Sequence, residues 1–358
     1  MPLYSIITGT GSYIPSKLVT NSDFLFNDFF DTDGKIFEKA NQSIIEKFKE
    51  ITEIEERRYV SDELLLSDIA YYAAEDALNS SNIDKESLDY IIIAHNFGNI
   101  EENNRRSECV PSIAAKVKHS LRIRNPDCVA YDIAFGCPGW VQGVIQADYY
   151  IKSGDAKKVL IIGSETLSRV SDPHDRDSMI YADGAGATIL EGIESEVPVG
   201  VISHKTRSDT LDHAYMLRMG KSNNPDYAGS ELFLKMNGHN LYKYALKYVP
   251  QLIKATLDKA GLILNDIKKI IIHQANEKMD EAIVKRLFSL YNEKEVTRGI
   301  MPMIISWLGN SSVATIPTLL DLIMKKKLNN HHIQKNDNIV FASVGAGMNI
   351  NCIVYRMP

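Results

Sequence analysis

Apolar residues recur along the chain in two patterns, one typical of amphipathic helices and one typical of buried strands. From Ile69 to Leu78 they fall on one face of a predicted helix, with Ser67 as its expected N-cap. A loop follows, and the apolar run at residues 90–94 then predicts a buried strand. These positions indicate a helix, loop and strand unit in the first half of the chain.

The same unit recurs in the second half. Leu257 precedes the apolar residues 270–272 by the spacing that separates Leu78 from residues 91–93, an offset of 179 positions in a chain of 358. A further apolar run at residues 159–163 is echoed at residues 339–343. Several matches in order predict two copies of one α/β unit, with mainly parallel sheets and helices between and outside them. We expect the halves to be residues 1–195 and 196–358, because polar residues and Pro198 interrupt the apolar pattern there.

A cysteine lies where a predicted strand meets a predicted helix. The apolar run at residues 128–134 ends at Gly136 and Cys137, and Pro138 then opens a helix with apolar positions from Trp140 onward. Such an elbow directs backbone N–H groups and the positive end of a helix dipole at the sulfur, which predicts a reactive thiolate near neutral pH. The alternative is a structural cysteine packed as a small apolar residue.

Three later segments carry residues that fit a nucleophilic cysteine. His273 follows the strand at residues 270–272, and functional residues often lie at the carboxyl ends of strands in α/β folds; the alternative is a core histidine. Asn310 lies in a turn before a predicted helix, where by itself it would be a helix cap. The turn at Gly345–Gly347 can present backbone N–H groups closely, and with the N–H of Cys137 it can form an oxyanion hole.

Composition narrows the classes of protein. The chain is 44% hydrophobic and 24% charged, which is typical of a globular protein, and its net charge of −6 argues against nucleic-acid partners and anionic membranes. No apolar run reaches the roughly 18 residues needed to cross a bilayer. The four cysteines show no metal-binding spacing, so we expect free thiols, a cytoplasmic location and no metal. The segment from Gly9 to Pro15 lacks the third glycine of a dinucleotide fingerprint, which argues against a nucleotide site.

Taken together, the sequence resembles the thiolase-fold condensing enzymes, and among them the β-ketoacyl-[acyl carrier protein] synthase III family. The resemblance implies a duplicated αβαβα fold of five layers and a homodimer formed across the N-terminal halves. The segments that carry it occur in the family's order and extend over nearly the whole chain: Gly11-Ser12-Tyr13-Ile14-Pro15 with Thr20-Asn21, Arg57-Arg58, the Cys137 elbow, Lys152-Ser153-Gly154, Gly163-Ser164-Glu165, Asp172-Pro173-His174-Asp175-Arg176, Asp183-Gly184-Ala185-Gly186-Ala187, His273-Gln274-Ala275-Asn276 and Gly309-Asn310-Ser311-Ser312.

The resemblance also implies the chemistry. Cys137 would accept an acyl group as a thioester, and His273 and Asn310 would stabilise the enolate formed when a malonyl-type or β-ketoacyl-type extender loses CO₂. The N–H groups of Cys137 and Ala346 would hold the tetrahedral oxyanion. The expected activity is an acyltransferase that performs decarboxylative Claisen condensation in fatty-acid or polyketide-type lipid synthesis. It needs no bound cofactor, because both substrates arrive as coenzyme A or phosphopantetheine thioesters.

The implied protein partner is an acyl carrier protein. The resemblance assigns substrate or carrier binding to Arg176, Asn276, Lys243, Lys278 and Lys285; considered alone, the lysines are typical of a solvated helix face.

Departures from the family pattern predict a specialised acyl donor. Glu53 replaces the usual glycine before Arg57-Arg58, and no tryptophan precedes it where many members stack the coenzyme A base. Pro138 and Ala346 also differ from the commonest pattern, and the segment from Gly98 to Arg106 is enlarged where the family builds its acyl pocket. Such departures occur in members that make secondary lipids.

Three other functions are compatible with parts of the sequence. The same cysteine could join two acyl thioesters, or transfer an acyl group, without decarboxylation; the presence of His273 and Asn310 favours decarboxylation. A Cys-His-Asn hydrolase uses the same residue types in the same order, but it does not require the duplication. A nonenzymatic subunit would be expected only if Cys137 were absent.

Overall fold

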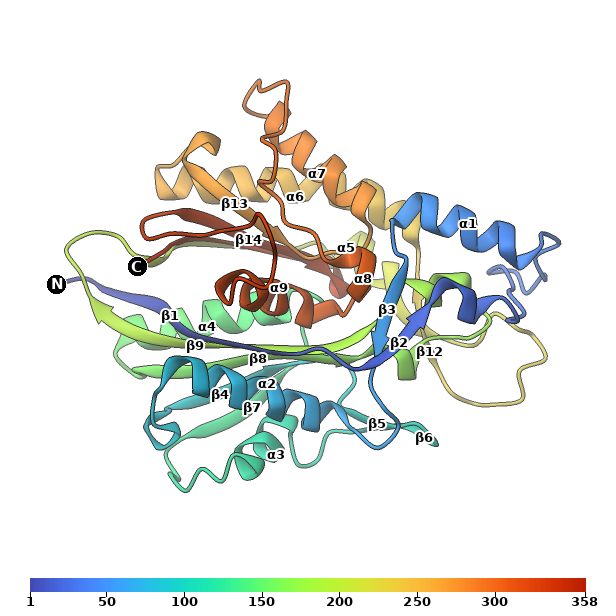
Figure 1. The fold of residues 1–358 in the computed structure, drawn as a ribbon, viewed down its shortest axis with the longest axis horizontal. Helices are drawn as coiled ribbons and strands as arrows, with labels where there is room; N and C mark the ends of the chain where they lie inside the picture. Colours follow the sequence, from blue (N-terminus) through green and yellow to red (C-terminus); the bar gives the residue numbers. More distant parts are fainter.

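The computed structural model describes all residues from 1 to 358 and arranges them in five layers (Figure 1). The first sheet has the order β1-β9-β8-β4-β7, in which β4 lies parallel to β7 and β8 while β9 runs antiparallel to β1 and β8. Its strands are β1 (Leu3–Tyr13), β4 (Tyr90–Ala94), β7 (Val129–Ile133), β8 (Lys158–Thr166) and β9 (Asp183–Glu194).

The second sheet repeats this order with one strand fewer, as β10-β15-β14-β13. In the place of a fifth strand runs an irregular segment, where the N–H of Ile270 donates to the carbonyl of Ile300 at 2.9 Å. The predicted duplication therefore appears in the sheet order, while the second copy has lost a regular edge strand. The strands are β10 (Gly200–Ser208), β13 (Ile267–Ile272), β14 (Asn338–Gly345) and β15 (Asn349–Arg356).

Three pairs of short strands extend from this framework near the ends of the sheets. They are β2 (Lys17–Thr20) with β3 (Glu56–Tyr59), β5 (Asn99–Glu101) with β6 (Asn104–Glu108), and β11 (Leu217–Gly220) with β12 (Phe233–Met236). The pair β5–β6 lies in the segment that the sequence marks as enlarged.

Helices form the central and outer layers. Between the sheets lie α4 (Gly139–Ser153) and α9 (Thr315–Met324); α2 (Leu66–Ser81) and α3 (Ile113–Ser120) cover the first sheet, and α6 (Gly238–Ala260) and α7 (Glu277–Ser289) cover the second (Figure 1). This is the predicted αβαβα order, but the prediction of mainly parallel sheets is wrong: both sheets are mixed, because β9 and β15 each run antiparallel to both of their neighbours. The remaining helices are α1 (Asn41–Thr52), α5 (Thr210–His213) and α8 (Ile305–Leu308).

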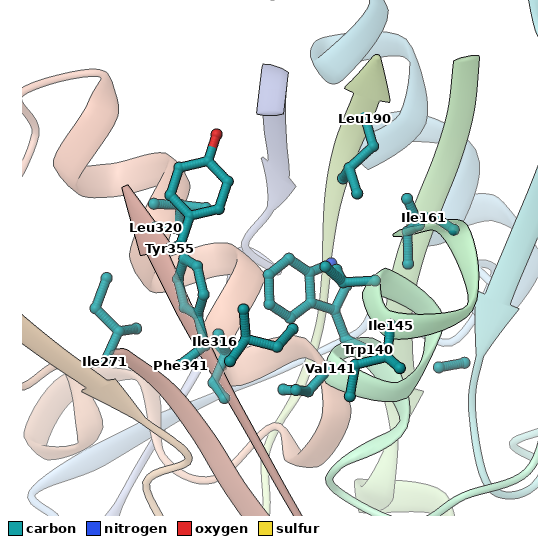
Figure 2. Packing of buried hydrophobic residues seen from close by; sticks show 14 of the residues in the cluster. Trp140, Val141, Ile145, Ile161, Leu190, Ile271, Ile316, Leu320, Phe341 and Tyr355 are labelled. Carbon is teal, nitrogen blue, oxygen red and sulfur yellow. The ribbon is translucent and has the colours of Figure 1, made fainter. Parts of the chain in front are cut away.

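The core between the sheets joins the two halves (Figure 2). Trp140 of α4 is fully buried and meets the ring of Phe341 of β14 edge to face, with ring centroids 5.5 Å apart. Tyr355 of β15 accepts a hydrogen bond on its hydroxyl from the N–H of Ile7 of β1 at 2.7 Å. Aromatic burial of this kind contributes several kcal/mol and fixes α4, and with it the cysteine elbow, against both sheets.

The glycines at the start of the chain serve packing. β1 continues through Gly9 and Gly11 without a turn. A Cβ at Gly11 would lie 2.3 Å from the carbonyl oxygen of Ala73, and one at Gly9 would lie 2.6 Å from that of Ala77. These glycines allow α2 to approach the strand closely.

The start of α2 differs from the prediction. The N-cap is Leu65, and Ser67 lies inside the first turn, where its N–H donates to the side-chain oxygen of Asn99 at 2.9 Å. The side-chain amide of Asn99 thus satisfies a free N–H group in the first turn of the helix, where the sequence pattern had predicted a cap by Ser67 itself.

The change from one sheet to the other occurs between Glu194, the last residue of β9, and Gly200, the first residue of β10. We keep the division of the chain near residue 195 as a proposal for the two halves. No helix in the structure is both long and apolar enough to span a membrane.

Candidate active site

Cys137 lies on the connection from β7 to α4, as predicted. Gly136 before it has φ of +67°, a left-handed conformation that a residue with a Cβ rarely adopts. Pro138 follows as the N-cap of α4. The reversal brings the sulfur to the N-terminal end of the helix that crosses the centre of the molecule.

His273 and Asn310 reach the same region from the second half. His273 directly follows β13, and its N–H donates to the carbonyl of Ala342 at 2.9 Å. Asn310 is held by a hydrogen bond from its own N–H to the carbonyl of Ile180 at 3.0 Å, after the left-handed Gly309. The side-chain oxygen of Asn310 accepts from the N–H of Ser312 at 2.8 Å, so its NH₂ group is left to donate elsewhere.

One cavity of about 270 Å³ collects these side chains. Cys137, His273 and Asn310 all line it, although Cys137 and Asn310 are 173 positions apart in the sequence. Most of the remaining lining is apolar and comes from both halves and from the pair β11–β12: Phe97, Leu167, Leu217, Met219, Met236 and Met279. The sequence prediction that a thiol, an imidazole and an amide meet at one place agrees with this geometry.

Two glycines interlock the elbow with the turn after β14. A Cβ at Gly345 would lie 2.6 Å from the backbone nitrogen of Cys137, and one at Gly136 would lie 2.7 Å from the backbone nitrogen of Ala346. Gly345 therefore lies next to the backbone nitrogen of Cys137, and Gly136 lies next to that of Ala346. The two N–H groups predicted as an oxyanion hole are thus neighbours at the edge of the cavity, which Ala346 also lines.

The prediction of a reactive thiolate near neutral pH is wrong. Burial raises the pKa of Cys137 to about 11, and the negative charge of Glu165 acts in the same direction. A hydrogen bond from the hydroxyl of Ser312 to the sulfur, at 3.3 Å, opposes this shift without cancelling it. Loss of water around the sulfur outweighs this hydrogen bond, so Cys137 is a thiol at neutral pH.

Burial determines the protonation state of His273. The side chain is 5% exposed, and burial lowers its pKa to about 4. The imidazole is therefore neutral at neutral pH and carries one N–H donor and one acceptor nitrogen. Its Nδ1 atom is buried without a hydrogen-bond partner.

The sequence pattern indicates no role for Ser312, Asn96 or Glu165. Ser312 was noted only within the Asn310 motif and Glu165 only within a strand motif, and Asn96 gave no signal because it lies in an irregular segment after β4. In the structure, Ser312 and Asn96 both line the cavity. The one sequence feature that could have indicated these three residues is Glu165, a carboxylate near the end of an apolar strand.

The residues assigned to substrate or carrier binding lie outside the cavity. Arg176 lines a separate polar recess, with its guanidinium 5.0 Å from the centre of the Phe37 ring. Asn276 caps α7 by accepting a hydrogen bond from the N–H of Met279 at 2.9 Å. Arg218 and Met236 line both the recess and the cavity, so the two spaces adjoin.

The three lysines are exposed on α6 and α7. Lys243 borders a groove between these helices, Lys285 lies on α7, and Lys278 pairs with Glu53 at 3.4 Å. No cluster of three or more His, Cys, Asp or Glu side chains has the arrangement of a metal site.

Comparison with known proteins identifies the family. Residues 131–210 match the family 3-oxoacyl-[acyl-carrier-protein] synthase III, and residues 257–357 match its C-terminal family. The β-ketoacyl-[acyl-carrier-protein] synthase III 1 of Vibrio vulnificus is 32% identical over 96% of this chain and 97% of its own, and the synthase III of Xanthomonas campestris is 30% identical over 96% of both chains. The crystal structure of the Aquifex aeolicus 3-oxoacyl-[acyl-carrier-protein] synthase III matches with a TM-score of 0.77 and 28% identity, covering 98% of this chain and 99% of that one. The chain therefore belongs to the 3-oxoacyl-[acyl-carrier-protein] synthase III family.

Proposed function

We propose that this acyltransferase loads an acyl group on Cys137 and condenses it with a malonyl-type thioester on an acyl carrier protein, with loss of CO₂. One observation carries the assignment of roles: Cys137, His273 and Asn310 line a single apolar cavity next to two backbone N–H groups. Substrates arrive as coenzyme A or carrier-protein thioesters, and no cofactor is required.

In the first half-reaction the sulfur of Cys137 attacks the acyl carbonyl, and the donor leaves as a free thiol that takes up the proton. Because the resting group is a thiol, the proton has to leave the sulfur as the new bond forms. The N–H groups of Cys137 and Ala346 stabilise the oxyanion of the tetrahedral intermediate. Removing one such donor typically costs about 10²–10³ in rate.

In the second half-reaction the extender thioester places its carbonyl oxygen between His273 and Asn310. Both side chains are neutral donors, since burial lowers the pKa of His273 to about 4 and an amide does not titrate. They stabilise the enolate formed as the carboxylate leaves as CO₂, without protonating it. The enolate carbon then attacks the acyl carbonyl, the carbon–sulfur bond to Cys137 breaks, and the sulfur leaves as a thiolate that takes up one proton from solvent.

Delivery of the thioesters uses the recess that holds Arg176. This recess adjoins the cavity at Arg218 and Met236, and a phosphopantetheine arm entering through it would bring its thioester to Cys137. Arg176 lies against the ring of Phe37 at the wall of this recess, and we assign it to the phosphopantetheine or nucleotide end of the donor.

We assign the carrier protein to the basic side formed by Lys243, Lys285 and Arg286, which are exposed on α6 and α7. An acidic partner would gain mainly in association rate from such a surface. Lys278 contributes less, because it already pairs with Glu53.

We also propose that two copies associate through the first sheet. β7 is its edge strand, and Val129 on that strand is 48% exposed. An unpaired edge is a template for a second strand, and a homodimer would cover it. Sedimentation of the purified protein tests this: a monomer at micromolar concentration contradicts it.

We propose the cytoplasm as the location, because all four cysteines are free thiols.

The condensation is tested by following CO₂ release and product mass with an acyl thioester and malonyl carrier protein. We expect one CO₂ for each new carbon–carbon bond, and loss of both products in Cys137→Ala. Acyl products without CO₂ release would instead indicate acyl transfer or the joining of two acyl chains without decarboxylation.

A further inference from the structure

A line of three polar side chains leads from the interior of the first sheet to the sulfur of Cys137. The hydroxyl of Ser312 donates to Cys137 Sγ at 3.3 Å. The Nδ2 atom of Asn96 donates to Oγ of Ser312 at 3.4 Å and to Oε2 of Glu165 at 2.5 Å. We call Glu165, Asn96 and Ser312 the relay.

The relay joins elements that are distant in the sequence. Glu165 lies near the end of β8 and is fully buried, Asn96 follows β4, and Ser312 follows the Asn310 turn of the second half. The N–H of Asn96 also donates to Glu165 Oε2, at 3.1 Å, so the carboxylate holds Asn96 by both backbone and side chain. Ser312 has φ of +53°, a conformation that costs energy in a residue other than glycine. The surrounding contacts therefore hold each member in place.

The directions of the hydrogen bonds are fixed by the chemistry of the groups. An amide NH₂ has two protons; one serves Glu165, and the other is directed at the oxygen of Ser312. With its oxygen accepting from Asn96, the hydroxyl of Ser312 directs its own proton to the sulfur. Asn96 occupies one of the two lone pairs of this oxygen and so restricts rotation of the hydroxyl; without Asn96 the hydroxyl turns more easily to accept a proton from the thiol.

We propose that Asn96 is a positioning residue for acyl loading: anchored on Glu165, it fixes the hydroxyl of Ser312 as a hydrogen-bond donor to Cys137. The proposal rests on the proposed role of Cys137 as nucleophile. A donor to sulfur stabilises negative charge as the thiol loses its proton and again when Cys137 leaves after condensation. It acts on both half-reactions.

Glu165 also acts on the sulfur directly through its charge. Glu165 is the one carboxylate that raises the pKa of Cys137 by its charge, and the side chain of Asn96 lies in the line of hydrogen bonds between them. The other titratable groups at the cavity are His273, which is neutral, Tyr181, whose pKa burial raises well above 10, and Arg218 on β11. The Oε1 atom of Glu165 is buried without a partner, so Asn96 carries its principal contact.

The test measures alkylation of Cys137 by iodoacetamide against pH, with mass spectrometry of the Cys137 peptide, and then acyl loading. We expect Ser312→Ala to slow loading about tenfold to a hundredfold, which corresponds to one hydrogen bond to a charged group. Its alkylation profile should shift to higher pH. Asn96→Ala should shift both readouts in the same direction by less, and Ser311→Ala, whose hydroxyl contacts Thr315 at 3.3 Å and not the sulfur, is the matched control without effect.

The decisive comparison is the double variant. Because Asn96 is proposed to act only through Ser312, Asn96→Ala should change neither readout further in the Ser312→Ala background. Glu165→Gln should shift alkylation to lower pH, because it removes the negative charge that this carboxyl carries above its raised pKa of about 7. Additive effects of the two alanine substitutions, or a wild-type profile for Asn96→Ala, would overturn the proposal. Alkylation needs no acyl substrate, so this result is independent of whether the condensation itself is correctly assigned.

Discussion

Replacing Gly345 by alanine tests the interlock between the elbow and the turn after β14. The backbone of Gly345 is extended, with φ of −167°, so alanine adopts it without strain. Its Cβ, however, would lie 2.6 Å from the backbone nitrogen of Cys137 and 2.9 Å from Cys137 Cβ. The substitution therefore acts by steric displacement of the nucleophile and of its N–H donor.

The size of the effect follows from this contact. Ordinary van der Waals contact requires the two atoms to move apart by roughly 0.8 Å. A displacement of that size misdirects an oxyanion donor, which predicts a loss of acyl loading of about 10²–10³-fold. Over-packing of the same contact should lower the free energy of unfolding by about 1–3 kcal/mol.

The assay combines acyl loading of Cys137, followed by intact-protein mass, with urea unfolding. Gly154→Ala is the matched control: this glycine ends α4 with φ of +84° and nothing lies within 4 Å of a Cβ there. It should destabilise the protein by about 1 kcal/mol and leave loading unchanged. A folded Gly345→Ala protein that loads at the wild-type rate would refute the reasoning, as would an equal loss of loading in Gly154→Ala.

Substitutions at three further residues test the assigned roles and the core. Asn310→Ala should retain acyl loading and slow CO₂ release by about a hundredfold, because it removes one donor to the enolate; equal loss of loading would show that the roles are wrongly divided. Asp280→Asn should raise the free energy of unfolding, measured with urea, at pH 8 but not at pH 4. Both carboxyl oxygens of Asp280 are buried without partners, and burial raises the pKa of this group in the folded protein. The ionised carboxyl therefore destabilises the fold once the pH rises above the pKa that Asp280 has in the unfolded chain. No difference at pH 8 would mean that this carboxyl is solvated. Trp140→Ala should cost about 3–5 kcal/mol in unfolding, and Trp140→Phe clearly less, since Phe341 keeps an aromatic partner; equal losses would show that the contact does not hold the halves together.

The sequence predicted those parts of the site that depend on local pattern. Apolar periodicity predicted the strand before Cys137, the helix after it and the strand before His273, and all three are present in the structure as β7, α4 and β13. Asn310 and the Gly345–Gly347 turn were predicted because turn residues are recognisable without a partner.

Features that depend on tertiary contacts were missed. The pKa of Cys137 is raised by burial in a cavity whose lining includes Asn310, Ser312 and Ala346, all more than 170 residues away in the sequence. The cap of α2 moved to Leu65 because Asn99 satisfies the N–H of Ser67 from another element. The relay was invisible for the same reason: Glu165, Asn96 and Ser312 have no shared spacing, and only the packing of both halves makes them neighbours.

The most direct test of the account follows a single turnover. Acylated protein is isolated, its adduct is located by peptide mass on Cys137, and malonyl carrier protein is then added in excess. The account predicts that the adduct disappears at the rate at which CO₂ appears, one for one, and that the acyl group is recovered in the elongated product. An adduct on another residue, or one on Cys137 that persists while CO₂ is released, would contradict it.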